Sequence, residues 1–216
     1  MTSITNLKEF KDIHNNKTAI LIGNGPSLKK GKKYFDYATK KKYLFFGNNN
    51  SIFEKILFKL HYFVISDEKS FRKVNKKKYI KATVKKEKFF VSNKEREKKI
   101  LTKEELKKSK GKSFDMSNNK ILKRIKKEFV NGSSLLITFQ LILLMGIKKI
   151  YLAGCDCGGD TNFYLTKKIT DYTHLINRWK YLKEYTKKYY PDVKIYVINP
   201  VNLKDVFPED PNYFKS

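Results

Sequence analysis

The chain has 216 residues, of which 40% are hydrophobic and 14% aromatic, and this composition excludes an intrinsically disordered protein. The length suits one domain with a continuous core, so we predict a single domain over residues 1–216. The formal net charge is +27, from 48 basic and 21 acidic residues, which makes nucleic acid or an anionic membrane a candidate partner. We favour the alternative of a genome rich in A and T, whose codons favour Lys, Asn, Ile, Phe and Tyr, because the lysines occur along the whole chain.

The compartment is predicted from the start of the chain and from its cysteines. The opening "MTSITNLKEFKDIHNNK" is polar and does not have the pattern of a signal peptide, and no apolar run reaches the length of a membrane span. Cys155 and Cys157 are separated by one residue, so on an extended segment they point to opposite faces and are poorly placed for a disulfide. We expect a cytoplasmic protein whose surface lysines favour peripheral contact with the anionic inner face of the membrane.

Four strands are predicted in the first half of the chain. The apolar run "TAILIG" at residues 18–23 is typical of a buried parallel strand, and "KYLFFGNNNS", "HYFVISDEKS" and "KFFVSNKE" give three more. Each of them ends in small or polar residues. Because the carboxyl ends of parallel strands meet at one edge of an open sheet, we expect a ligand site at that edge.

Residues 94–128 have a different composition, with many charges and few apolar positions, as in "KEREKKILTKEELKKSKGKSFD". We predict a solvated helix and loop here, inserted into the domain and able to act as a lid.

The last third of the chain again alternates helix and strand. An apolar helix is predicted after "NGSS" and ends at Met145 and Gly146, and "KKIYLAG" follows as a buried strand. The segment "THLINRWKYLKEYTKKYYP" is an amphipathic helix with Leu175, Trp179 and Leu182 on one face, and "DVKIYVINP" is the final strand. The predicted fold class is therefore α/β, with a mostly parallel sheet and helices on both faces.

The turn "GNGPSL" is the first candidate for binding. Gly23 and Gly25 allow either a positive φ or a close approach of a ligand to the backbone, Pro26 fixes the chain, and Ser27 can cap the next segment. Free N–H groups in such a turn suit phosphate or ribose oxygens. The turn is neither a Walker loop nor a G-x-G-x-x-G fingerprint, and an ordinary strand-to-helix turn explains it equally well.

Further candidates follow later strands. Asn48 and Asn49 carry amides that suit a base edge or a sugar hydroxyl, and Ser133 and Ser134 stand where a helix start makes an anion site. Plain caps and loop asparagines are the alternative for all four. Asp156 could bind a ribose diol, or hold magnesium together with Asp160.

His174 is the candidate general base, since it follows the loop in which a site is expected. Tyr164 and Tyr172 lie in that loop and could donate protons to a leaving phosphate. The structural alternative is a histidine that makes a hydrogen bond at a helix start.

The segments "ILIGNGPSL", "FFGNNN", "NGSSLLITFQLILLMGIKKIYLAGCD" and the final "INP" together resemble the bacterial sialyltransferases of glycosyltransferase family 42. They also resemble flagellin-glycosylation-associated proteins and the 6-hydroxymethylpterin pyrophosphokinase (MptE-like) family, which share the same Rossmann-like core. The resemblance covers most of the chain except residues 94–128.

The resemblance implies roles for particular residues. It assigns cytidine-nucleotide contacts to Asn24 and Asn48, a place in the nucleotide site to Ser133, Ser134 and Gly154, and the catalytic base to His174. Two departures stand out. The family's Arg before the hydroxyl pair is replaced by Val130 and Asn131, and its Tyr after the motif Asp by Gly158.

The resulting hypothesis is a glycosyltransferase that moves a sugar from a nucleotide-activated donor, most simply a CMP-sugar, to a glycan acceptor. The resemblance implies no metal and no obligate cofactor, because a CMP leaving group carries one phosphate. Two alternatives stay open. One is a pyrophosphokinase that uses ATP and magnesium, with Asp67, Asp156 and Asp160 as candidate ligands. The other is a basic nucleotide- or nucleic-acid-binding protein without catalysis; we expect no specific nucleic-acid partner.

Overall fold

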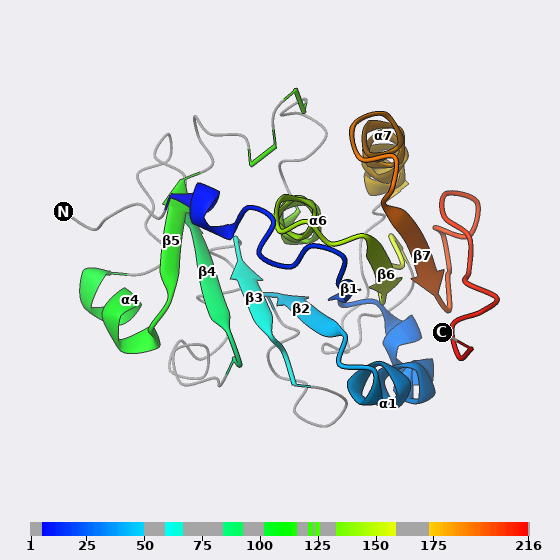
Figure 1. Ribbon diagram of the computed structural model, residues 1–216, viewed down its shortest axis with the longest axis horizontal. Coiled ribbons are helices and arrows are strands. Elements are labelled where there is room, and N and C mark those ends of the chain that lie inside the picture. The colour runs from blue at the N-terminus through cyan, green and yellow to red at the C-terminus, as the bar shows by residue number, and fades with distance from the viewer. Residues whose placement is uncertain are drawn as a thin grey trace.

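The described part of the chain forms a parallel β-sheet with helices on both faces (Figure 1). This computed structural model describes residues 6–49, 59–66, 84–92, 102–115, 121–122, 124–125, 133–158 and 173–215. The strands are β1 (Thr18–Ile22), β2 (Leu44–Asn48), β3 (Tyr62–Ile65), β4 (Glu87–Ser92), β5 (Lys112–Asp115), β6 (Lys149–Ala153) and β7 (Lys194–Ile198). They lie in the order β5-β4-β3-β2-β1-β6-β7, and every neighbouring pair is parallel.

The described helices are η1 (Leu7–Phe10), η2 (Pro26–Lys30), α1 (Lys32–Lys40), α4 (Lys103–Ser109), α6 (Ser134–Leu144) and α7 (Thr173–Tyr189). Helices α6 and α7 lie on one face of the sheet, and α1 lies on the other (Figure 1). The chain moves outward from β1 through β2 to β5, and then returns to the other side of β1 with β6 and β7. Such a reversal next to β1 is the position at which open α/β sheets bind ligands. The predicted fold class is confirmed.

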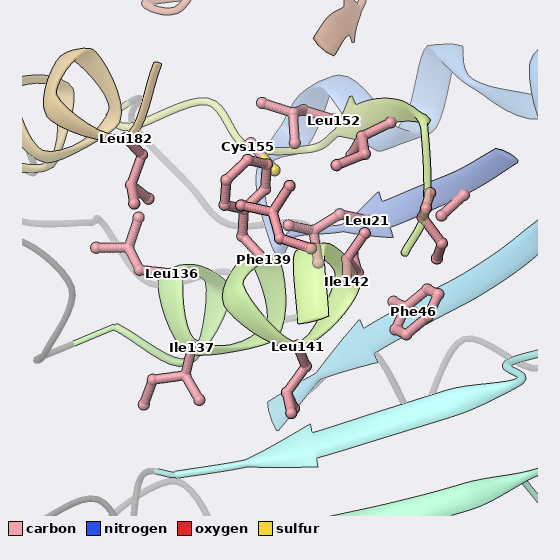
Figure 2. Packing of buried hydrophobic residues seen from close by; sticks show 14 of the residues in the cluster. Leu21, Phe46, Leu136, Ile137, Phe139, Leu141, Ile142, Leu152, Cys155 and Leu182 are labelled. Carbon is pink, nitrogen blue, oxygen red and sulfur yellow. The ribbon is translucent and has the colours of Figure 1, made fainter. Parts of the chain in front are cut away.

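Both faces of the sheet are buried, and the strands alternate between two cores. In β1, Ala19 and Leu21 belong to the core under α6 and α7, whereas Ile20 and Ile22 belong to the core under α1. Figure 2 shows the first of these cores, with Leu136 of α6 pointing toward Leu182 of α7. This burial on both faces explains the continuous apolar runs from which the strands were predicted.

Helix α7 has the buried face that its sequence predicts. The ring of Trp179 is 1% exposed and lies edge-on to Phe139 of α6, with 5.4 Å between the ring centroids. It also lies edge-on to Phe207 of the segment after β7, with 6.0 Å between the ring centroids. Trp179 therefore ties α7 both to the sheet-covering helix α6 and to the carboxyl-terminal segment.

The charged segment 94–128 contains more structure than a helix and a loop. The predicted helix is present as α4, but residues 112–115 then form β5, which pairs with β4 and extends the sheet. The side chains of Leu122 and Ile125 are buried in the core. The prediction failed here because four residues with one aromatic side chain carry too little periodicity to reveal an edge strand. Among the residues that the structure describes, no helix is both long and apolar enough to cross a membrane.

Candidate functional site

The turn after β1 continues along the tip of β6. The amide of Gly23 donates to the Ala153 carbonyl at 2.7 Å, and the amide of Gly25 donates to the Gly154 carbonyl at the same distance. A Cβ atom on Gly23 would lie 2.1 Å from the carbonyl oxygen of Gly154. The first glycine is therefore required by the close approach of two backbone segments, and the approach of a ligand to it stays a prediction.

Asp156 holds this turn in place from the end of β6. Its Oδ2 accepts the Ser27 amide at 2.9 Å, and its Oδ1 accepts the Ser27 hydroxyl at 2.5 Å. The carboxyl group is 4% exposed, and burial raises its pKa above the usual range, while the two bonds from Ser27 oppose that shift. We call this arrangement the Asp156 clamp. It gives Asp156 a structural role beneath the turn, and its direct contact with a nucleotide stays a prediction.

A second network joins β1, β2 and α6. The Asn48 amide donates to the Ile22 carbonyl at 2.6 Å and accepts the Ser134 hydroxyl at 3.3 Å. Asn49, which adopts a left-handed φ of 41°, donates to the Ser134 oxygen at 2.7 Å. Asn48 is 1% exposed, so its amide fixes the start of α6 against the tips of two strands.

The amino end of α6 lies at the same edge of the sheet. Its N-cap, Ser133, is extended, half-buried and makes no capping hydrogen bond, and the hydroxyl of Ser134 is used in the network with Asn48 and Asn49. Within the described ranges, no side chain is seen to cap the first N–H groups of the helix. Such groups, at the positive end of the helix dipole, favour an anion.

Among the described residues, two buried amide atoms near this edge have no hydrogen-bond partner. They are Oδ1 of Asn24, two residues past the end of β1, and Nδ2 of Asn199, one residue past β7. The strand ends Ile22 and Ile198 share one row of the sheet, with Ala153 of β6 between them. A buried unpartnered polar atom costs about 1–3 kcal/mol, so the edge keeps an acceptor and a donor that a ligand can satisfy.

Asn199 was not among the predicted site residues. The sequence signal was present, because Asn199 ends the final strand directly before Pro200, but a single asparagine after a strand is common in turns. Its φ of 48° and its unpartnered amide are visible only in the structure. Among the buried side chains described, Gln140 Oε1 is the third atom without a partner, and it lies in the middle of α6.

His174 lies exposed at the start of α7. Because α7 leads into β7, which is parallel to the other strands, its first turn belongs to the carboxyl edge of the sheet, as does the first turn of α6. The predicted residues Gly23–Ser27, Asn48, Asn49, Ser133, Ser134, Gly154, Asp156 and His174 therefore share one edge. Tyr164 and Tyr172 lie outside the described residues, as do Asp67 and Asp160.

The other two histidines lie at the opposite edge, near the start of β3. His14 Nε2 is 2.5 Å from the Tyr62 hydroxyl, and His61 Nδ1 accepts the Phe45 amide at 3.1 Å. Within the described ranges, no three His, Cys, Asp or Glu side chains gather as they would around a metal ion. Cys155 and Cys157 are free thiols and both are buried.

Comparison with known proteins places the chain in a family. Residues 1–162 match the family model described as 6-hydroxymethylpterin diphosphokinase MptE-like, so the chain belongs to the MptE-like family. No curated protein matches it.

Two solved structures of the sialyltransferase CstII from Campylobacter jejuni have a similar fold. One, in complex with the substrate analogue cytidine-5'-monophosphate, is 19% identical with a TM-score of 0.59, covering 92% of this chain and 87% of that one. The other, in complex with CMP-3FNeuAc, is 20% identical with a TM-score of 0.55, covering 91% and 87%. The Rossmann-like α/β fold is therefore shared across most of both chains.

Proposed function

We propose that this protein is a glycosyltransferase that binds a nucleotide-activated sugar, with a cytidine monophosphate leaving group, at the carboxyl edge of its sheet. The observation that carries the proposal is the amino end of α6, which has no side-chain cap and lies at the same edge of the sheet as the Gly23–Ser27 turn. Backbone donors at a helix start suit one phosphate. The unpartnered Oδ1 of Asn24 supplies an acceptor for an amino group or a sugar hydroxyl in the same place.

The two CstII structures support the choice of nucleotide. Each was solved with a cytidine nucleotide or its sugar conjugate, on a fold that matches at least 91% of this chain. The order of the matching segments along the chain adds to this support. These segments are a Gly-rich turn, an asparagine pair and a helix start, and all three lie at one edge of the sheet in the fold described above.

In the proposed reaction the acceptor hydroxyl attacks the anomeric carbon of the donor sugar. The new carbon–oxygen bond forms as the bond to the phosphate oxygen breaks, and CMP leaves. His174 takes the acceptor proton, and Tyr164 or Tyr172 donates to the departing phosphate oxygen. Ser133 and the first N–H groups of α6 stabilise the phosphate, and no step requires a metal.

A diphosphokinase that transfers from ATP is the second candidate, and the name of the matching family favours it. That chemistry needs a divalent ion, for which acidic ligands are required. Asp156 is an unfavourable ligand, because its buried carboxylate already accepts two hydrogen bonds from Ser27. The candidate would therefore depend on Asp67 and Asp160.

A thermal-shift panel of nucleotides separates the two candidates. The glycosyltransferase proposal expects stabilisation by CMP in the presence of EDTA, with little effect of ATP. Stabilisation by ATP only when magnesium is added would replace it with the diphosphokinase. A response to neither nucleotide would contradict both.

Release of CMP from CMP-sugar donors then tests the assigned base. His174→Ala should lower turnover by about 10²–10⁴-fold while CMP still stabilises the protein. Asn177→Ala is the matched control, since Asn177 is also exposed and lies one turn further along α7. Full turnover by His174→Ala would show that another group is the base.

A further inference from the structure

The surface around α1 concentrates positive charge. Between residues 29 and 42 the chain exposes seven lysines and one acid, Asp36. The carboxylate of Asp36 is bonded to Lys32 at 2.5 Å within the helix. The lysines are Lys29, Lys30, Lys32, Lys33, Lys40, Lys41 and Lys42.

An exposed aromatic side chain stands beside these lysines. Phe214 is 47% exposed, and its ring lies 5.0 Å from Tyr34 and 5.5 Å from Tyr37, both on α1. The neighbouring Tyr213 is buried and donates its hydroxyl to the Tyr34 carbonyl at 2.9 Å. Figure 1 shows the carboxyl-terminal segment ending close to α1. Phe214 is thus held against the helix by its buried neighbour.

The lysines and the aromatic rings are in direct contact. The ammonium group of Lys33 lies 5.3 Å from the ring centroid of Tyr34 and 5.5 Å from that of Phe214. Lys41 lies 5.6 Å from the ring of Tyr37. We call Lys33, Tyr34, Tyr37, Lys41 and Phe214, with the exposed Lys40, the basic-aromatic face.

Comparison with helix α7 shows that exposed lysines alone do not distinguish the basic-aromatic face from the rest of the surface. It also exposes lysines, among them Lys180, Lys187 and Lys188. Its aromatic side chains belong to or pack on the core, and among the described residues the exposed large hydrophobic side chains are Ile13, Val201 and Phe214. A basic surface with an exposed ring therefore distinguishes α1 from α7.

We propose that the basic-aromatic face docks onto an anionic lipid bilayer. Lysine ammonium groups attract the phosphates of anionic lipids, and aromatic side chains settle at the boundary between headgroups and acyl chains. The long lysine stems can lie along the rings while their charges stay in water. Single-stranded nucleic acid fits less well, because Lys33 already lies over the rings on which bases would stack.

Vesicle co-sedimentation tests the docking face. The full chain should bind vesicles of phosphatidylcholine with about 30% phosphatidylglycerol, and should leave pure phosphatidylcholine vesicles unbound. Each lysine near an anionic surface strengthens binding about fivefold, so the triple substitution Lys33→Gln, Lys40→Gln and Lys41→Gln should weaken binding by about a hundredfold. The control carries Lys180→Gln, Lys187→Gln and Lys188→Gln, which removes the same charge from α7.

A second pair of variants tests the aromatic part. Phe214→Ser should weaken vesicle binding, whereas Ile13→Ser should not, although Ile13 is exposed to nearly the same extent, at 46% against 47%. Circular dichroism and melting temperature confirm that each variant is folded. Absence of binding by the unmodified protein, equal losses in the two lysine triples, or tighter and α1-dependent binding to an oligonucleotide would each overturn the proposal.

Discussion

Gly25 has an ordinary backbone conformation, with φ at −74°, so this glycine is required for space and not for a left-handed turn. A Cβ atom at this position would lie 2.3 Å from Oδ2 of Asp156. The Asp156 clamp therefore needs a residue without a side chain directly above it. The close packing of Gly25, Ser27 and Asp156 sets the path of the turn at the proposed nucleotide site.

The first prediction follows from this packing. Gly25→Ala should destabilise the protein by about 1–3 kcal/mol, because the methyl group displaces a buried carboxylate. It should also abolish stabilisation by CMP. Denaturant unfolding measures the first effect and thermal shift the second. The double variant Gly25→Ala with Asp156→Ala removes the clash, so its cost should fall short of the sum of the single costs by about 0.5–3 kcal/mol. Strict additivity would contradict the steric account.

At the scale of single elements, α6 connects the core to the site. Its apolar side chains are buried along almost the whole helix, while its first turn is fixed by hydrogen bonds to Asn48 and Asn49. Neighbouring serines at its start consequently differ in environment. Ser134 belongs to the network, and Ser133 makes no capping bond.

A pair of substitutions separates these roles. Ser134→Ala should cost about 1–3 kcal/mol of stability, since it removes a buried hydroxyl that donates to the Asn48 side chain and accepts from that of Asn49. Ser133→Ala should change stability by less than about 0.5 kcal/mol and yet weaken CMP binding, if its hydroxyl faces the phosphate. Isothermal calorimetry with CMP and chemical denaturation of both variants give the comparison. Unchanged CMP binding in Ser133→Ala would remove this serine from the proposed site.

The start of β3 carries a pH-sensitive contact, in which the His61 ring accepts the Phe45 amide. Burial lowers the pKa of His61 to about 4, from an ordinary value of 6.5, and Lys85 and Lys86 add to the shift. At a pH between about 4 and 6.5, His61 therefore binds a proton in the unfolded chain but not in the folded protein. The stability from the neutral ring is complete above about pH 6.5 and declines as the pH falls toward 4.

The melting temperature should therefore fall between pH 7 and pH 5, and it should fall less in His61→Gln. The pKa of His14 is lowered by burial as well, so part of the dependence should persist in that variant. His174→Gln is the control, because it changes an exposed ring and leaves the contact at β3 intact. Equal pH dependence in all three proteins would rule out His61 as a source.

At the scale of the whole molecule, Trp179 joins α7, α6 and the carboxyl-terminal segment. It is the one tryptophan of the chain, so its fluorescence reports the packing between these parts. We expect its unfolding transition in urea to coincide with the loss of helix measured by circular dichroism, as for a single cooperative domain. Two separate transitions would show that the single-domain prediction is wrong.

The sequence was informative wherever burial produced long apolar runs. Helix α6 and the strands β1, β2, β3, β4, β6 and β7 were predicted for this reason, whereas α7 was predicted from its amphipathic pattern. Helix α6 has a continuous apolar stretch between a serine pair and Gly146, so both its ends were visible. The short edge strand β5 has neither length nor alternation and was missed.

Apart from Asn199, the residues of the candidate site were predicted from the sequence, but the hydrogen bonds between them were not. The turn at Gly23–Ser27 and the acidic residue at position 156 were both selected, although 129 residues separate Ser27 from Asp156. No local pattern indicates that one would clamp the other. The unpartnered amide of Asn199 is likewise a property of tertiary packing. Long-range hydrogen bonds of this kind are set by the assembled sheet and not by neighbouring residues.

The two buried thiols that follow β6, Cys155 and Cys157, have a practical consequence. Burial raises the pKa of Cys155 and raises that of Cys157 to about 12, so neither forms the reactive thiolate in the native fold. Because both thiols are buried, we expect alkylating reagents to modify them only when the chain opens at the β6 tip. The rate of their modification would thus report how often the structure around the β6 tip unfolds locally, without any introduced label.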